Sequence, residues 1–185
     1  MANVDAAFGF VPVRHLSGSG SCRTNKYTIA SGLAENIFNG DLCIIDANGQ
    51  ITPHTATEVN NIGVFGGVSY TDSTGAYVYK EFWASGTTGT DIVAYIYDDP
   101  FVIYKVQSAG TPAQTNIGNC ADVVAGAGST VTGQSGFEIS GTMAAGIATC
   151  KIVARHDTPD NAFGANAVME VLVNEHILGS NVAGI

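Results

Sequence analysis

The feature that most restricts the fold of this chain is the way turn residues divide it into short apolar or alternating runs. "GDLCIIDANGQIT" (residues 40–52) has two such runs around Asn48-Gly49, and "IGVFGGVSYTDSTGAYVYKEFW" (62–83) has two around "DSTG" (72–75). Runs of this length that end at Gly, Asn or Asp are typical of strands joined by hairpins. We therefore expect two hairpins, with a type I′ turn at Asn48-Gly49, because Asn tolerates a positive φ and Gly adopts one freely.

The same pattern continues towards the C-terminus and predicts an all-β fold. The further strand candidates are "TDIVAYIYDD" (90–99), "PFVIYKVQ" (100–107), "SGFEIS" (135–140), "ATCKIVARH" (148–156) and "AVMEVLVNEHIL" (167–178). Only "GLAENIF" (32–38) and "IGNCADVVA" (117–125) are candidates for short helical turns, since neither keeps a helical period for long. We expect an antiparallel β-barrel or β-sandwich, jelly-roll-like, with at most one or two short helical turns.

Residues 1–26 lack a sustained period and predict an extended N-terminal arm. Apolar residues are followed by a Ser/Gly-rich stretch that would act as a hinge. The domain organisation we expect is the arm (1–26), a β-barrel or β-sandwich body (27–178) and a C-terminal tail (179–185). The residues that we expect to anchor the arm to a neighbouring subunit are Phe8, Phe10, Val11, Pro12, Val13 and Arg14.

The low charge of the chain indicates a surface that contacts other protein. Charged residues make up 12% of the sequence, about half the usual share of a soluble domain. The formal net charge of −9 argues against nucleic acid as a partner, because binding to phosphates needs clustered Lys and Arg. The N-terminus lacks a secretory signal pattern, and no apolar run is long enough to cross a membrane, so we expect synthesis in the cytoplasm and no membrane partner.

No complete catalytic motif is present in the sequence. "GQSGF" (133–137) resembles a nucleophile elbow, but Phe137 stands where the last glycine is needed. The four histidines and the four cysteines do not have the spacing of a zinc site, and the glycine-rich segments lack the lysine of a phosphate-binding loop. We therefore expect no catalytic residue, no cofactor and no metal, and a protein that is not an enzyme.

Two acidic segments have alternative interpretations. Asp157, Asp160 and Asn161 in "RHDTPDNAFG" could offer oxygen ligands to calcium, but the same residues are typical of a turn between strands. Asp98-Asp99 could be an acid pair, but Pro100 removes a backbone donor and restricts the residue before it. We interpret both segments as turns, and the second as the corner between two strands.

The order of several segments resembles that of the decoration or cement proteins of tailed bacteriophages. The resemblance runs from Ala2 to about His176 and includes "ANVDAAFGFVPVRHLSG", "NNIGVFGGVSYTDSTG", "FWASGTTGTDI", "DDPFVIYKVQ" and "DNAFGANAVMEVLVNEH". It implies a β-rich virion protein that binds the outside of the phage head and stabilises contacts between major capsid subunits. Its implied partners are the major capsid protein and copies of itself, as a homotrimer or, alternatively, a dimer. It implies no cofactor.

Two other functions fit the sequence. The chain could be another structural virion protein, such as a shell, head-fibre or tail component. It could also be a carbohydrate-binding β-sandwich, with Tyr70, Tyr77, Tyr79 and Trp83 as stacking platforms for sugar rings.

Overall fold

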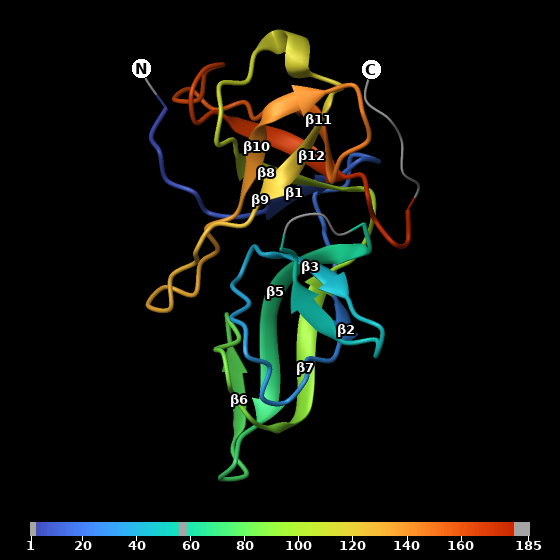
Figure 1. Ribbon diagram of the computed structural model, residues 1–185, viewed down its shortest axis with the longest axis vertical. Coiled ribbons are helices and arrows are strands. Elements are labelled where there is room, and N and C mark those ends of the chain that lie inside the picture. Colours follow the sequence, from blue (N-terminus) through green and yellow to red (C-terminus); the bar gives the residue numbers. More distant parts are fainter. Residues whose placement is uncertain (1–2, 56–58, 180–185) are drawn as a thin grey trace.

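The computed structural model describes residues 3–55 and 59–179 of the protein, and in these residues nearly all regular structure is β (Figure 1). The strands are β1 (Val11–His15), β2 (Asn25–Tyr27), β3 (Leu42–Ile45), β4 (Ile51–Pro53), β5 (Asn61–Thr71), β6 (Tyr77–Lys80), β7 (Thr90–Tyr97), β8 (Val102–Gln107), β9 (Cys120–Val124), β10 (Glu138–Ala144), β11 (Cys150–Arg155) and β12 (Val168–Val173). One 3₁₀ turn, η1 (Gln114–Asn116), precedes β9.

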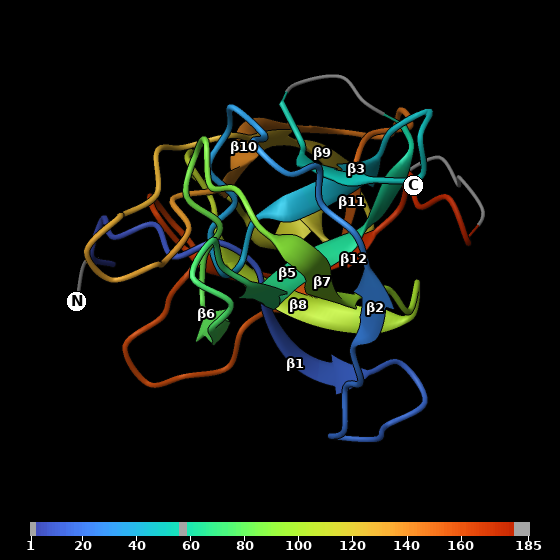
Figure 2. The same ribbon diagram turned by 90° about the horizontal axis from the view of Figure 1, so that it is seen from below.

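The strands form two antiparallel sheets that pack as a sandwich. The first sheet has the order β1-β8-β12-β11-β9-β10, and the second has the order β2-β7-β5-β3-β4, with β6 paired to β5. The first sheet occupies the upper half of Figure 1 and the second the lower half, and Figure 2 shows the second sheet from below. The expected all-β sandwich is confirmed.

Each sheet has its own apolar core, and the two cores approach each other through β3 and β5. Along β7 the side chains of Ile92, Ala94 and Ile96 are buried, while the intervening residues face the other side of the sheet. This alternation follows from the two-residue period of a strand. Leu42 and Val64 belong to the second sheet but pack in the core of the first sheet, so the two halves share buried apolar contacts.

The hairpin between β3 and β4 has a different turn from the one expected. Gly49 has a positive φ of 74°, but Asn48 does not, so the type I′ prediction is wrong. The Asp46 carboxylate accepts hydrogen bonds from the backbone N–H groups of Asn48 and Gln50, both at 2.8 Å. These bonds favour a turn in which only the glycine adopts the left-handed conformation. Asp72 and Gly75 form the same arrangement between β5 and β6.

Neither of the two segments expected to form a short helical turn is helical. Residues 32–38 form turns and an isolated bridge between Ile37 and Trp83, and residues 117–125 contain β9. In β9 the side chains of Cys120, Ala121 and Val123 are buried in the core of the first sheet. Burial on a pleated strand therefore outweighs the weak helical pattern of this segment.

Residues 3–26 differ most from the expected arm over residues 1–26, whose first two residues lie outside the described residues. The structure places β1 at the edge of the first sheet, paired to β8, and β2 at the edge of the second sheet, paired to β7. The segment is therefore part of the body and not an extended arm, and the expected boundary at residue 26 falls inside β2. Residues 180–185 of the expected tail lie outside the described residues, and Gly179 ends the described chain.

The segment before β1 docks where the two sheets meet. Gly9 has a φ of 75°, and a Cβ atom there would overlap the Cβ of Ser135 and lie 2.7 Å from the carbonyl oxygen of Gly40. Phe10 donates a backbone hydrogen bond of 2.8 Å to that carbonyl, and its buried ring packs edge-on against Tyr104 at 6.2 Å between centroids. Only glycine can occupy position 9 without moving the backbone.

We expect Gly9→Ala to destabilise the protein more than Gly18→Ala does. Both glycines have a positive φ, but a Cβ atom at Gly18 would have nothing within 4 Å. Gly18→Ala should therefore cost only the conformational strain, about 1–2 kcal/mol, while Gly9→Ala should cost about 3 kcal/mol or more because overlap adds to strain. Urea unfolding of both variants measures the difference. Equal losses would contradict this account of the docking.

Candidate functional site

The expected contact residues of the N-terminal segment lie mostly against the chain itself. Phe10 is 1% exposed and is therefore unavailable to a neighbouring subunit. Phe8 is half-buried, with the Lys105 ammonium 6.0 Å from its ring centroid, and the Arg14 guanidinium donates to Glu170 at 2.8 Å. The other three, Val11, Pro12 and Val13, are half-buried in β1. The set lies in and just before the edge strand β1, and the contacts named here join it to the chain's own sheet.

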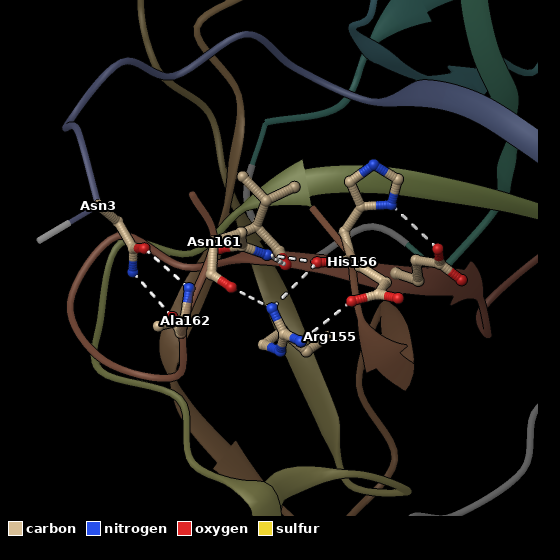
Figure 3. A network of polar contacts seen from close by, with 8 residues as sticks. Asn3, Arg155, His156, Asn161 and Ala162 are labelled. Carbon is tan, nitrogen blue, oxygen red and sulfur yellow. Dashed lines mark hydrogen bonds and ion pairs between the residues drawn. The ribbon is translucent and has the colours of Figure 1, made fainter. Parts of the chain in front are cut away.

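The three residues that could offer ligands to calcium, Asp157, Asp160 and Asn161, lie in the loop between β11 and β12. The Asn161 side chain donates to the carbonyl oxygens of His156 and Val168 and accepts from the Val168 N–H, so it holds its own loop together. Arg155 donates a hydrogen bond to the Asn161 carbonyl oxygen. The Asn3 side chain donates to the carbonyl oxygen of Ala162 and accepts from its N–H group (Figure 3). The Asp157 side chain is 97% exposed beside Arg155. Within the described residues, no group of three or more His, Cys, Asp or Glu side chains is placed to hold a metal.

The Asp98-Asp99 segment is a corner, but one that passes from one sheet to the other. Strand β7 lies in the second sheet and β8 in the first. Asp98 is buried and accepts hydrogen bonds from Asn25 at 2.9 Å and from the Tyr27 hydroxyl at 2.6 Å. Asp99 accepts from the Phe101 N–H at 2.9 Å, and its Oδ2 lies 3.3 Å from Nε2 of His15. Burial and, after it, the bond to Asp98 raise the pKa of Tyr27.

A surface with four tyrosine side chains lies on the second sheet and has the properties of an interaction site. We call it the tyrosine face and define it as Tyr77 and Tyr79 of β6 and Tyr95 and Tyr97 of β7. Tyr77 is 73% exposed and Tyr79 is 56% exposed, and the rings of Tyr79 and Tyr95 lie 6.2 Å apart. Tyrosine is enriched at protein interfaces because it combines a large apolar ring with a hydroxyl group.

Two glycines of β5 make room for these rings. A Cβ atom at Gly66 would lie 2.9 Å from the ring of Tyr97, and one at Gly67 would lie 2.5 Å from the hydroxyl of Tyr79. The Tyr95 hydroxyl lies 3.1 Å from the hydroxyl of Ser69. The side chains of Ser69 and Tyr77 lower the pKa of Tyr95. The tyrosine face is therefore held in place by contacts across β5, β6 and β7.

The sequence predicted only half of this surface. Tyr77 and Tyr79 are exposed as a binding surface would need, but Trp83 is 0% and Tyr70 5% exposed, and these two pack edge-on at 5.6 Å in the core. Sequence reasoning missed Tyr95 and Tyr97. The signal that would have found them is their position two residues apart in β7, which places both on the face opposite to buried Ile96.

A buried carboxyl group marks the place where the sheets meet. Asp41 is 1% exposed, and its Oδ2 accepts a hydrogen bond of 2.7 Å from the Phe38 N–H. The carboxyl group also lies near the Ser135 hydroxyl, which acts on it as a hydrogen-bond donor. Burial raises the pKa of Asp41 to about 6, against the opposing effects of the Phe38 N–H and the nearby Ser135 hydroxyl.

Comparisons of the chain with protein families, with characterised proteins and with solved structures find no match. In the part of the chain that the structure describes, no helix is long and apolar enough to cross a membrane.

We expect Asp41 to make the protein less stable as the pH rises from about 4 to 6. A folded pKa of about 6 against an ordinary value of 3.8 means that the folded state holds the proton more tightly. Deprotonation should then cost about 3 kcal/mol of unfolding free energy over this range. Urea unfolding at pH 4, 5, 6 and 7, with Asp41→Asn as the reference, isolates this contribution. A variant with the same pH dependence as the wild type would contradict it.

Proposed function

We propose that the protein is a capsid decoration protein of a tailed bacteriophage, which binds the outside of the head and stabilises contacts between major capsid subunits. The observation that carries the proposal is the tyrosine face, in which the rings of Tyr77 and Tyr79 are exposed and Gly66 and Gly67 leave room for the rings of Tyr97 and Tyr79. Such a surface suits binding without a chemical step, because large rings in fixed positions lose little freedom on contact. The resemblance of the segment order supports the same function.

The low charge of the chain is consistent with this role. A surface with few ionic groups avoids the cost of desolvating charges when it is covered by protein. Three other exposed apolar side chains line a hollow of about 370 Å³ near the corner between the sheets; they are Leu16, Phe101 and Leu178. A protein that contacts two capsid subunits, or one subunit and a second copy of itself, needs two such surfaces.

The proposed partners are the major capsid protein and copies of this chain. A homotrimer would match positions of threefold symmetry on a head, and a dimer would match twofold positions. Binding only to the assembled head shifts the equilibrium towards assembly by mass action. Many copies on one head repeat that gain.

We expect the double variant Tyr77→Ala/Tyr79→Ala to bind heads at least about tenfold more weakly than the wild type, because exposed tyrosines are frequent hot spots of binding energy. The measurement is co-sedimentation of the purified protein with DNA-free heads of the phage that encodes it. Val131→Ala is the control, since Val131 is 93% exposed but lies outside the tyrosine face. Wild-type protein that stays in the supernatant at every concentration would overturn the proposed function.

The tyrosine face also favours one second candidate, a carbohydrate-binding protein. Tyr77 and Tyr79 offer exposed rings for stacking on sugars, whereas buried Trp83 does not. On a glycan array this candidate predicts a signal that Tyr77→Ala/Tyr79→Ala removes and that Val131→Ala keeps. An array without any signal would eliminate it.

A further inference from the structure

The last described residues of the chain fold back on the start of β5. The Ile177 N–H donates a hydrogen bond of 2.8 Å to the Asn61 carbonyl oxygen, and the Asn61 side chain donates one of 3.0 Å to the Glu175 carbonyl oxygen. The side-chain oxygen of Asn61 lies 2.7 Å from Nδ1 of His54. His176 lies in the middle of this contact and is 3% exposed, although Ile177 beside it is 49% exposed. A buried imidazole therefore joins an otherwise exposed end of the chain to the second sheet.

The hydrogen bonds of the His176 ring require a neutral imidazole. Its Nδ1 accepts a hydrogen bond of 3.1 Å from the Leu178 backbone N–H, so this nitrogen carries no proton. In the neutral ring the proton is then on Nε2, and the Ile62 backbone acts on the ring as a hydrogen-bond partner. A second proton could bind only at Nδ1, where it would face the N–H of Leu178 and break that bond.

The surroundings of His176 oppose protonation on balance. Burial lowers the pKa of the ring, against the opposing effects of the nearby Asp98 and Asp99 carboxylates and of the Ile62 backbone. Both carboxylates already accept hydrogen bonds from other residues, and Asp99 also lies beside the His15 imidazole. A histidine with a lowered pKa binds its proton less tightly in the folded state than in the unfolded state. The stability that the neutral ring contributes is therefore lost as the pH falls below about 6.5.

The residues that follow His176 lie on the corner between the sheets. The Gly179 N–H donates a hydrogen bond of 2.9 Å to the His176 carbonyl oxygen, and a Cβ atom at Gly179 would lie 3.1 Å from the Cβ of Pro100. Leu178 and Gly179 line the hollow of about 370 Å³ that Phe101 also lines. Release of residues 177–179 from this place would therefore remove one side of the hollow.

We propose that His176 is an acid-sensitive latch, whose neutral ring holds residues 177–179 against the corner between the sheets and whose protonation releases them. At pH 7.5 the ring accepts the Leu178 N–H and the hollow is complete. In acid the imidazolium has no acceptor at Nδ1 and is costly to keep buried, so the ring leaves its place and the residues after it detach. This inference stands on the contacts of His176 and does not depend on the proposed function.

The test is an NMR titration of ¹⁵N-labelled protein from pH 7.5 to pH 4.5. At pH 7.5 the ring ¹⁵N signals of His176 should show an unprotonated Nδ1 and a protonated Nε2. As the ring takes up its second proton, we expect the protection of the Leu178 amide from hydrogen exchange to fall at least tenfold, with the same midpoint as the ring signals. The Phe10 amide, which donates to the Gly40 carbonyl oxygen, should stay protected and so exclude global unfolding. A protonated Nδ1 at pH 7.5, or Leu178 protection that is independent of pH, would overturn the proposal.

Three variants separate the latch from a general effect of acid. His176→Asn keeps a side-chain oxygen that can accept the N–H two residues on, as Asn does in turns, but it does not titrate. This variant should keep Leu178 protected throughout the titration, whereas His176→Ala should lack the protection at every pH. His156→Gln is the matched control, because His156 bonds to Glu170 and not to residues 177–179. It should leave the pH dependence at Leu178 unchanged.

Two outcomes among these variants contradict the latch. One is a His176→Asn protein with the same pH dependence at Leu178 as the wild type, and the other is a His156→Gln protein that has lost it. The ring signals of wild-type His176 decide the protonation state even if a variant does not fold.

Discussion

The arrangement of the two sheets depends on two chain segments that cross between them side by side. The chain passes from β7 to β8 through the corner at residues 98–101, and the N-terminal segment passes from β1 to β2 in the opposite direction, with β1 paired to β8 and β2 paired to β7. Asp98 joins the two crossings, because its buried carboxylate accepts hydrogen bonds from Asn25 and Tyr27. A carboxylate is well suited to this place, since it can accept several bonds at once and bonds to a charged group are stronger than neutral ones.

The crossing explains why the sequence predicts the positions of the strands better than it predicts which strands pair with each other. Alternation along 90–99 and 100–107, broken at Pro100, is a local property, and the sequence therefore locates both strands and the corner. The same letters also fit a simple hairpin, because the assignment of β7 and β8 to different sheets depends on pairing with β2 and β1, some 70 to 90 residues away. Nothing in residues 11–15 or 25–27 taken alone specifies those partners, and the segment therefore resembled an arm.

The candidate surfaces likewise have features that the local sequence predicts and features that depend on contacts distant in sequence. Exposure of Tyr77 and Tyr79 follows from their position next to a polar turn, which the sequence makes visible. Burial of Trp83 does not, because it depends on the bridge to Ile37 and on the packed ring of Tyr70. Asp41 could not be distinguished from an ordinary surface carboxylate, since its burial arises only when β3, β5 and the segment around Ser135 come together.

The edges of both sheets limit how another protein could contact the molecule. Strand β1 carries Pro12 and a change of register between Pro12 and Arg14, β4 ends at Pro53, and β10 has a change of register between Ile139 and Met143. Prolines, bulges and short strands are the devices by which natural proteins prevent a further strand from pairing with an exposed edge. At β1, β4 and β10 strand addition is therefore a poor route to assembly, which favours contacts between side chains on the faces of the sheets. The tyrosine face has the exposure and the fixed geometry that this route requires, so interaction through it is compatible with sheets whose edges stay unpaired.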